Sequence, residues 1–217
     1  DASESLGTFY TDGIYKGKHT GTIGSFGCLS FNGNKVITTG GGGMILTNSK
    51  KKAERASYLT TQAKDDPIRY IHNNIGFNYR MTNIQAALGV AQLENLKLFL
   101  KRKKEIFNYY KKSISSIKGL SICKVPDYAS NNHWLNILRI ETKIYGKNKN
   151  QLMKDLRSQL IETRPLWHLN HLQNPYRKNQ NYRISNAVDL INNSLCLPSS
   201  TNLDNKDMKR ILKELNA

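Results

Sequence analysis

The sequence predicts a mixed α/β protein, and three features of its pattern support this fold class. Residues 28–47 alternate apolar stretches with a polar turn and a run of four glycines, which is typical of strands joined by tight loops. A long helical pattern begins at Thr82. From about Ser121 onward, a strand pattern precedes two amphipathic helical patterns, which indicates a second, small α+β domain.

Length and composition set the first limits. At 217 residues and 38% apolar content, the chain is long enough for one sizeable core or two small ones. It contains no apolar run of membrane-spanning length and no signal-peptide pattern, so we expect a soluble cytoplasmic protein without a membrane partner. Because the chain starts at Asp1 without a methionine, we expect a fragment of a longer protein.

The three cysteines and the charge exclude further classes. Cys28, Cys123 and Cys196 are widely spaced and form no CxxC pair, so we expect no disulfide framework and no structural metal site. The formal net charge of +17 would suit a basic nucleic-acid-binding module. The lysines are spread along predicted helices, however, so we expect a solvated surface that helps to attract a nucleotide diphosphate, and no nucleic-acid partner.

The N-terminal strands surround a single lysine. Lys35 is the only lysine or arginine between Lys18 and Lys50. It follows a polar turn and precedes a β-branched stretch, which predicts an exposed lysine between one strand and a second strand over 36–39. Such a lysine serves either to protect a sheet edge or as a reagent whose neutral amine attacks carbonyl groups.

Helix signals follow in order. Ser49 is a candidate cap for a helix over 49–63, and residues 11–15 form a candidate hairpin insertion. Thr82 and Gln85 form a capping box at the start of a long helix that we expect to link the two domains. Its aromatic residues recur at helical spacing, which favours a place in the core over nucleic-acid binding: Phe99, Phe107, Tyr109 and Tyr110.

The second half predicts a strand over 133–140 and helices over 149–162 and 204–215. His168 and His171 are three residues apart, as metal ligands can be, but no acidic partner lies near them in the sequence. We therefore expect no metal there. A substrate contact and a surface position remain open for both histidines.

Several segments together resemble one enzyme family. DASESLG (1–7), SFNGNKVITTGGGGM (30–44), IGFNYRMTNIQAALGVAQLE (75–94), RPLWHLNH (164–171) and LCLPSS (195–200) are similar to the sugar aminotransferases of the DegT/DnrJ/EryC1/StrS family, in the family's order. The resemblance implies a fold-type-I aminotransferase that depends on pyridoxal phosphate. It assigns residues 1–110 to the C-terminal part of the large domain with its linking helix, and residues 111–217 to the small α+β domain.

The resemblance also implies roles for individual residues. Lys35 would hold pyridoxal phosphate through a Schiff base and then act as general base and acid. Asp1 would pair with the ring nitrogen of the cofactor, Glu4 would approach the ring hydroxyl, and Ser30 would bind the phosphate. Asn78 would reach the phosphate in the neighbouring subunit of a homodimer with shared active sites.

The implied reaction is transfer of an amino group from glutamate to C4 of a nucleotide-linked 4-keto-6-deoxy sugar, for surface-glycan or flagellin-glycan biosynthesis. His168 and His171 would border the nucleotide-sugar site. The NGNK form around Lys35 is most similar to members acting on UDP-linked 4-keto-6-deoxy-N-acetylhexosamines, and a lysine at this position argues against the family's dehydratase branch. The alternative is a truncated fragment of such an enzyme without activity.

Overall fold

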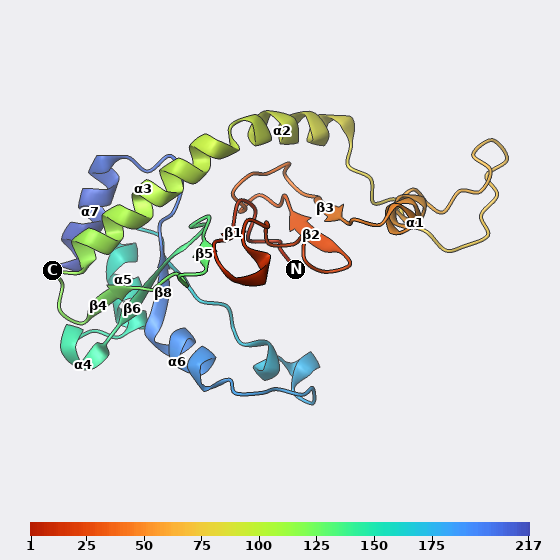
Figure 1. Cartoon of the computed structure of the whole chain (residues 1–217). Coiled ribbons are helices and arrows are strands. Elements are labelled where there is room, and N and C mark those ends of the chain that lie inside the picture. Colours follow the sequence, from red (N-terminus) through yellow and green to blue (C-terminus); the bar gives the residue numbers. More distant parts are fainter. The chain divides into compact units, whose positions relative to one another are not determined.

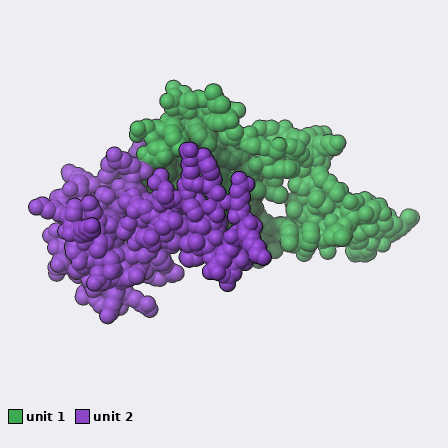
Figure 2. Space-filling view, turned by 90° about the horizontal axis from the view of Figure 1, so that it is seen from below, with its two compact units in different colours: residues 1–101, 125–134 green, residues 102–124, 135–217 purple.

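The structure is a computed structural model that describes residues 1–217 and divides into two units, coloured separately in Figure 2. Unit 1 comprises residues 1–101 and 125–134, and unit 2 comprises residues 102–124 and 135–217. The predicted domain boundary after residue 110 stays a prediction. None of the helices combines the length with the apolar character needed to cross a lipid bilayer.

Unit 1 begins with a short strand and a turn. Strand β1 (Phe9–Tyr10) pairs antiparallel with β5 (Ala129–Ser130), which the chain supplies more than a hundred residues later. Between Tyr10 and Lys18 lies a 3-10 turn, η1 (Gly13–Tyr15), and the Tyr10 N–H donates to the Lys18 carbonyl at 3.0 Å. The hairpin predicted here is therefore present, whereas its description as an insertion relative to the family stays a prediction.

The lysine segment lies in the connection of a second hairpin. Strands β2 (Gly27–Ser30) and β3 (Gly43–Leu46) pair antiparallel, with Ser30 opposite Gly43 (Figure 1). A Cβ atom on Gly43 would lie 2.5 Å from the Leu29 carbonyl oxygen, so this close approach requires glycine.

The strand predicted over 36–39 is wrong. This stretch is a bend that folds back on the preceding strand, and the Thr39 N–H donates to the Phe31 carbonyl at 3.0 Å. Ile37 and Thr39 are buried at 3% and 4% exposure. Burial therefore explains the β-branched residues of this stretch. The strand that pairs with β2 is β3, which begins at the last of the four glycines.

The helices of unit 1 begin where their caps predict. Ser49 accepts a hydrogen bond from the Lys52 N–H at the start of α1 (Lys50–Thr60). Thr82 and Gln85 form the predicted capping box of α2 (Asn83–Glu94). The long helix is not continuous, however, because it turns at Asn95, whose side-chain amide donates to the Ala91 carbonyl at 2.9 Å.

Helix α3 (Leu96–Ile114) follows directly and runs from unit 1 into unit 2. Of its aromatic residues, Tyr110 is fully buried and its hydroxyl donates to the Pro198 carbonyl at 3.1 Å. Burial raises the pKa of Tyr110 well above its ordinary value. Tyr109 is half-buried and packs against the core. Phe99 and Phe107 are half-buried but do not belong to this core cluster, so a core position is confirmed only for the two tyrosines.

Unit 2 is built on a four-stranded antiparallel sheet, as the predicted α+β domain requires. The strand order is β4 (Leu120–Ile122), β6 (Asn136–Ile140), β8 (Ser194–Leu197) and β7 (Arg164–Pro165). Side chains alternate along β6, so Leu138 and Ile140 face the core whereas Arg139 faces the opposite side. The strand predicted over 133–140 is present, but it begins at Asn136 and not at His133.

Helices cover this sheet. Figure 1 labels α5 (Lys149–Ser158) and α7 (Asn205–Leu215), which belong to the same unit as the sheet, and α3, which runs into that unit. The core joins strand residues to side chains of these three helices. Helix α5 ends before the predicted residue 162 because Leu160 takes a left-handed conformation with φ of 56°, and the Ile161 N–H turns back to the Leu156 carbonyl. The remaining short elements are α4 (Thr142–Tyr145), η2 (Asn170–Leu172), η3 (Asn174–Tyr176) and α6 (Ser185–Asn193).

Candidate active site

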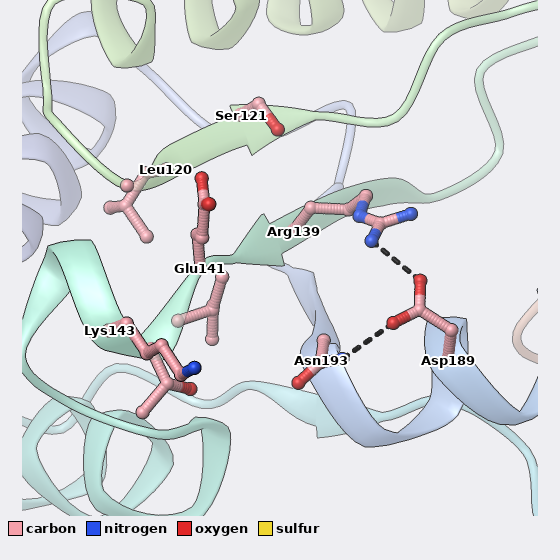
Figure 3. Close-up of a pocket in the computed structure, with 10 residues that line it drawn as sticks. Leu120, Ser121, Arg139, Glu141, Lys143, Asp189 and Asn193 are labelled. Atoms are coloured by element: carbon pink, nitrogen blue, oxygen red, sulfur yellow. Dashed lines mark hydrogen bonds and ion pairs between the residues drawn. The ribbon is translucent and has the colours of Figure 1, made fainter.

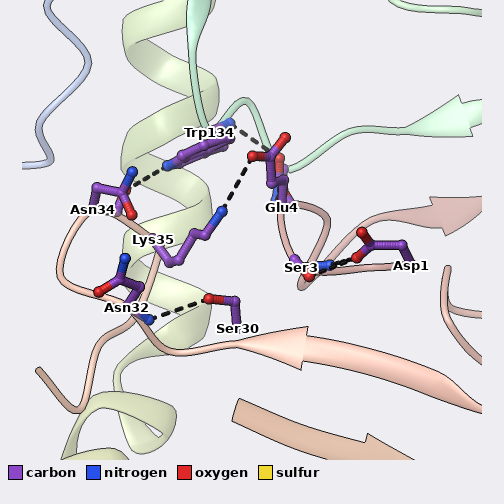
Figure 4. A network of polar contacts seen from close by, with 9 residues as sticks. Asp1, Ser3, Glu4, Ser30, Asn32, Asn34, Lys35 and Trp134 are labelled. Atoms are coloured by element: carbon purple, nitrogen blue, oxygen red, sulfur yellow. Dashed lines mark hydrogen bonds and ion pairs between the residues drawn. The ribbon is translucent and has the colours of Figure 1, made fainter. Parts of the chain in front are cut away.

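Lys35 lies at the end of a polar turn (Figure 4). Its side chain is only 12% exposed, so the exposed position predicted for this lysine is wrong. The turn is held locally, because the Lys35 N–H donates to the Asn32 carbonyl at 3.0 Å and the Asn32 side chain accepts from the Gly33 N–H at 3.0 Å. Asparagine and glycine favour such turns, which explains why NGN precedes the lysine. The amine is thereby directed into unit 1.

Two side chains contact the Lys35 amine. Glu4 Oε1 lies 3.2 Å from Lys35 Nζ, and the same Nζ lies 4.4 Å from the centroid of the Trp134 ring. Glu4, Lys35 and Trp134 line one small cavity, together with residues that complete its wall: Ser3, Leu6, Ser30, Val36 and Ile37. The cavity therefore combines an amine, a carboxylate, hydroxyl groups and apolar surface.

A buried asparagine brings these segments together. The Asn132 side-chain amide donates to the carbonyls of Glu4 and Leu6 at 2.9 and 3.0 Å. The Asn132 side-chain oxygen accepts a hydrogen bond from the backbone N–H of Trp134 at 3.0 Å, and the backbone N–H of Asn132 donates to the Thr8 hydroxyl at 3.1 Å. With 4% exposure, Asn132 fixes the segment that carries Glu4 to the segment that carries Trp134.

The structure brings three of the predicted cofactor residues into this cavity: Glu4, Ser30 and Lys35. Asp1 lies nearby in the sequence but outside the cavity wall, where its Oδ1 accepts from the Ser3 N–H at 2.9 Å and from the Ser3 hydroxyl at 2.5 Å. The roles proposed for all four residues stay predictions.

The other predicted residues lie elsewhere. Asn78 is exposed, forms an isolated β-bridge with Thr61, and is absent from the cavity wall. His168 and His171 belong to unit 2, where His168 is exposed and His171 is half-buried in η2. Nowhere in residues 1–217 do three or more His, Cys, Asp or Glu side chains gather as a metal site would require.

Sequence reasoning missed Trp134 and Asn132. Asn132 lies just before the strand predicted over 133–140, and Trp134 falls within that predicted strand. No local signal shows that a residue about one hundred positions after Lys35 returns to its amine. Only the three-dimensional structure reveals this contact.

The chemistry of the cavity fits pyridoxal phosphate, which offers an aldehyde, a phosphate and a ring hydroxyl. Lys35 supplies a half-buried amine, and the Ser30 hydroxyl donates no hydrogen bond within the protein. Glu4 is 51% exposed and accessible to a ligand. The free volume for the centre of a water-sized sphere is about 10 Å³, at the lower limit of the roughly 10–15 Å³ that one water molecule needs, so this chain supplies a reactive wall and not an enclosed cofactor cavity.

Unit 2 contains a separate, open cavity of about 610 Å³ (Figure 3). Arg139 Nη2 lies 2.7 Å from Asp189 Oδ2, and the Asn193 amide donates to Asp189 Oδ1 at 2.8 Å. The hydrogen bonds from Asn193 and Arg139 lower the pKa of Asp189. Because Lys143 and Glu141 add one further charge of each sign, the wall favours no ligand of one charge.

Comparison with known proteins identifies the family. The model of the DegT/DnrJ/EryC1/StrS aminotransferase family matches residues 1–216. EpsN of Bacillus subtilis (strain 168), provisionally named a pyridoxal phosphate-dependent aminotransferase, is 38% identical over 221 residues, covering 99% of this chain and 54% of EpsN. GDP-perosamine synthase of Escherichia coli O157:H7 is 37% identical over 217 residues, covering 100% of this chain and 56% of the synthase.

A solved structure supports the same fold. The crystal structure of DesI in the presence of its TDP-sugar product superimposes with a TM-score of 0.87 at 23% identity, covering 100% of this chain and 54% of DesI. The chain thus spans about half the length of the curated relatives that it matches. The predicted α/β aminotransferase fold is confirmed. The chain belongs to the DegT/DnrJ/EryC1/StrS aminotransferase family, whose aminotransferases depend on pyridoxal phosphate.

Proposed function

We propose that the protein containing this chain transfers an amino group from an amino acid, glutamate, to C4 of a nucleotide-linked 4-keto-6-deoxy sugar, with Lys35 attaching the cofactor. The observation that carries the proposal is the half-buried Lys35 amine, which shares a cavity with Glu4 and Ser30. The names of GDP-perosamine synthase and of the DesI complex support a nucleotide sugar as substrate. We infer that the resulting amino sugar is used in the biosynthesis of surface or flagellin glycans.

Pyridoxal phosphate, when bound, supplies an aldehyde for an amine and a ring that accepts the electron pair of a broken C–H bond. Lys35 would hold the cofactor through Nζ, and its free amine would then move the proton at the donor's α-carbon. Overall, the donor exchanges its amino group for the carbonyl oxygen of the sugar. No external oxidant or reductant is therefore needed.

The neighbouring residues bind and orient. Ser30 donates its hydroxyl hydrogen to the phosphate, and Glu4 faces the ring hydroxyl. Asp1 holds the proton of the ring nitrogen. Both hydrogen bonds from Ser3 go to Asp1 Oδ1, which leaves Oδ2 to accept this one.

We infer further contacts from outside the cavity. Asn78 reaches the cofactor phosphate of a second subunit, and His168 with His171 contacts the nucleotide sugar. Asn78 can contact the phosphate of a second subunit only in a homodimer. The exposed position of Asn78 in unit 1 is compatible with such a contact. The three free cysteines support a reducing compartment, the cytoplasm, as the place of the reaction.

The test uses the full-length enzyme, meaning a protein of the relatives' length that contains this chain. It is incubated with ¹⁵N-glutamate and a nucleotide-linked 4-keto-6-deoxy sugar, and the sugar product is analysed by mass spectrometry. We expect ¹⁵N in an amino sugar with the wild-type enzyme and none with Lys35→Ala. Transfer that is undiminished in Lys35→Ala, or no transfer to any such sugar, would contradict the proposal.

A further inference from the structure

Trp134 makes two contacts with the lysine turn. Its ring lies under Lys35 Nζ, 4.4 Å from ring centroid to nitrogen, and its indole N–H donates to the Asn34 carbonyl at 2.7 Å (Figure 4). The first contact restrains the end of the lysine side chain. The second restrains the backbone from which that side chain starts. One residue therefore holds Lys35 at both ends.

Trp134 is itself fixed. Trp134 is 8% exposed, and its backbone N–H donates a hydrogen bond to the side-chain oxygen of the buried Asn132. The adjacent His133 has a left-handed backbone with φ of 49°, which turns the chain sharply between the two residues. Since Asn132 also binds the carbonyls of Glu4 and Leu6, the indole ring rests on a satisfied, buried network and not on a free loop.

The ion pair with Glu4 holds the Lys35 amine less firmly than the Trp134 ring does. Its side chain is 51% exposed, and ion pairs with a solvated partner contribute little because water competes for both charges. The face of a buried aromatic ring attracts a cation without losing it to water in this way. The ring is therefore the more durable of the two contacts.

We propose that Trp134 is a positioning residue for Lys35: its ring face holds the amine in the cavity, and its indole N–H fixes the turn that carries the lysine. The importance of this positioning for catalysis rests on the proposed function of Lys35. The contact between Trp134 and Lys35 does not depend on that function, and the test below measures the contact without cofactor.

The test follows Lys35 by NMR in cofactor-free protein whose lysines are reductively methylated with ¹³C. Methylation keeps the positive charge, and loss of one signal in Lys35→Arg assigns it. We expect the Lys35 methyl signals upfield of those of exposed lysines such as Lys50, because the ring shields nuclei above its face. The chain's other tryptophan, Trp167, is 57% exposed, so Trp167→Phe is the matched control.

Trp134→Leu should move the Lys35 signals to the position of exposed lysines, and Trp134→Phe should keep most of the upfield shift. Acetylation of Lys35 relative to Lys50 should rise about two- to fivefold in Trp134→Leu. A change common to all lysines would indicate a purely structural role and overturn the proposal, as would unmoved Lys35 signals.

If Trp134→Leu does not fold, the unsubstituted protein decides. A nuclear Overhauser contact between the Lys35 methyl groups and the indole ring supports the proposal, and its absence overturns it. Should another lysine prove to attach the cofactor, the proposed function would fail while this result stood.

Discussion

Lys103 is a buried lysine in unit 2, with 7% exposure. Its Nζ donates to the Ser199 carbonyl, so it binds the segment that follows β8 to helix α3. Burial lowers the pKa of Lys103 from 10.5 to about 8, because the charged form loses hydration. The position therefore makes stability depend on pH.

The direction of this pH dependence follows from the number of protons that Lys103 binds in the folded and in the unfolded state. Below pH 8 Lys103 is charged in both the folded and the unfolded protein, and the folded state carries the desolvation penalty. Between pH 8 and 10.5 the unfolded state binds more protons, so the contribution of Lys103 to the free energy of unfolding rises with pH. We expect this free energy, wild type minus Lys103→Met, to increase by roughly 3 kcal/mol from pH 7.5 to 10.5.

Urea unfolding at several pH values measures the difference. Burial raises the pKa of Cys196 to about 11, which lowers stability as pH rises above 9, but this effect is present in both proteins and cancels. A difference that stays constant with pH would contradict the assignment.

Ser30 is the hydroxyl that we assign to the cofactor phosphate. Loss of one charge-assisted hydrogen bond in Ser30→Ala should weaken pyridoxal phosphate binding by about 10- to 150-fold in the full-length enzyme. Absorbance titration of the cofactor-free enzyme measures this. Ser25→Ala is the control, because Ser25 is exposed and does not line the cavity. Equal affinities of the two variants would remove Ser30 from the site.

Among the residues of the cavity, the sequence was informative for those with a local signal. Lys35 was recognisable as an isolated lysine in an apolar stretch, and the family segments indicated Glu4 and Ser30. Trp134 could not be found in this way, since its place depends on Asn132 and on the return of residues 125–134 to unit 1. Such a contact is decided by tertiary structure alone.

Helix α5 shows how far local signals determine an element. Asn148 accepts hydrogen bonds from the N–H groups of Asn150 and Gln151, both at 3.0 Å, and Gln151 completes a capping box. The helix packs Leu152 and Leu156 into the core. Losing its cap should therefore destabilise the whole of unit 2.

We expect Asn148→Ala to lower the free energy of unfolding by about 1 kcal/mol. The control is Asn150→Ala, an exposed position inside the same first turn, where alanine should be neutral or slightly stabilising. Denaturant unfolding compares both with the wild type. If Asn150→Ala is as destabilising as Asn148→Ala, the cap is not the cause.

Caps explain why helix starts were predicted well: they depend on residues three positions apart. The strand predicted over 36–39 failed because strand pairing depends on a distant partner, and here the partner of β2 is the stretch after the glycines. The break at Asn95 was also missed, since an asparagine in a long helical pattern does not by itself indicate a turn.

Helix α2 bears on the assembly of the whole molecule. It is apolar in sequence yet has no buried residue, and Ile84 and Leu93 are 84% and 56% exposed. A largely apolar helix is normally buried. We therefore expect α2 to be covered in the full-length enzyme, either by the part of that protein outside this chain or, in the proposed homodimer, by a second subunit.

Mixing two inactive variants tests the shared site. In a heterodimer of full-length Lys35→Ala and Asn78→Ala, a composite arrangement places both defects in one site and leaves the other intact. At full subunit exchange, about one quarter of wild-type activity should return, because half of the dimers are mixed and each has one intact site. No recovery despite demonstrated exchange would show that Asn78 serves its own subunit or only its turn.

The attachment of the cofactor to Lys35 is tested most directly by trapping it. The full-length enzyme is loaded with pyridoxal phosphate, reduced with borohydride, digested, and its peptides are mapped by mass spectrometry. We predict one phosphopyridoxyl group on the peptide that contains Lys35, and its loss in Lys35→Arg while Lys50→Arg retains it. A label on another lysine, or an unlabelled Lys35 in enzyme that binds the cofactor, would contradict the assignment.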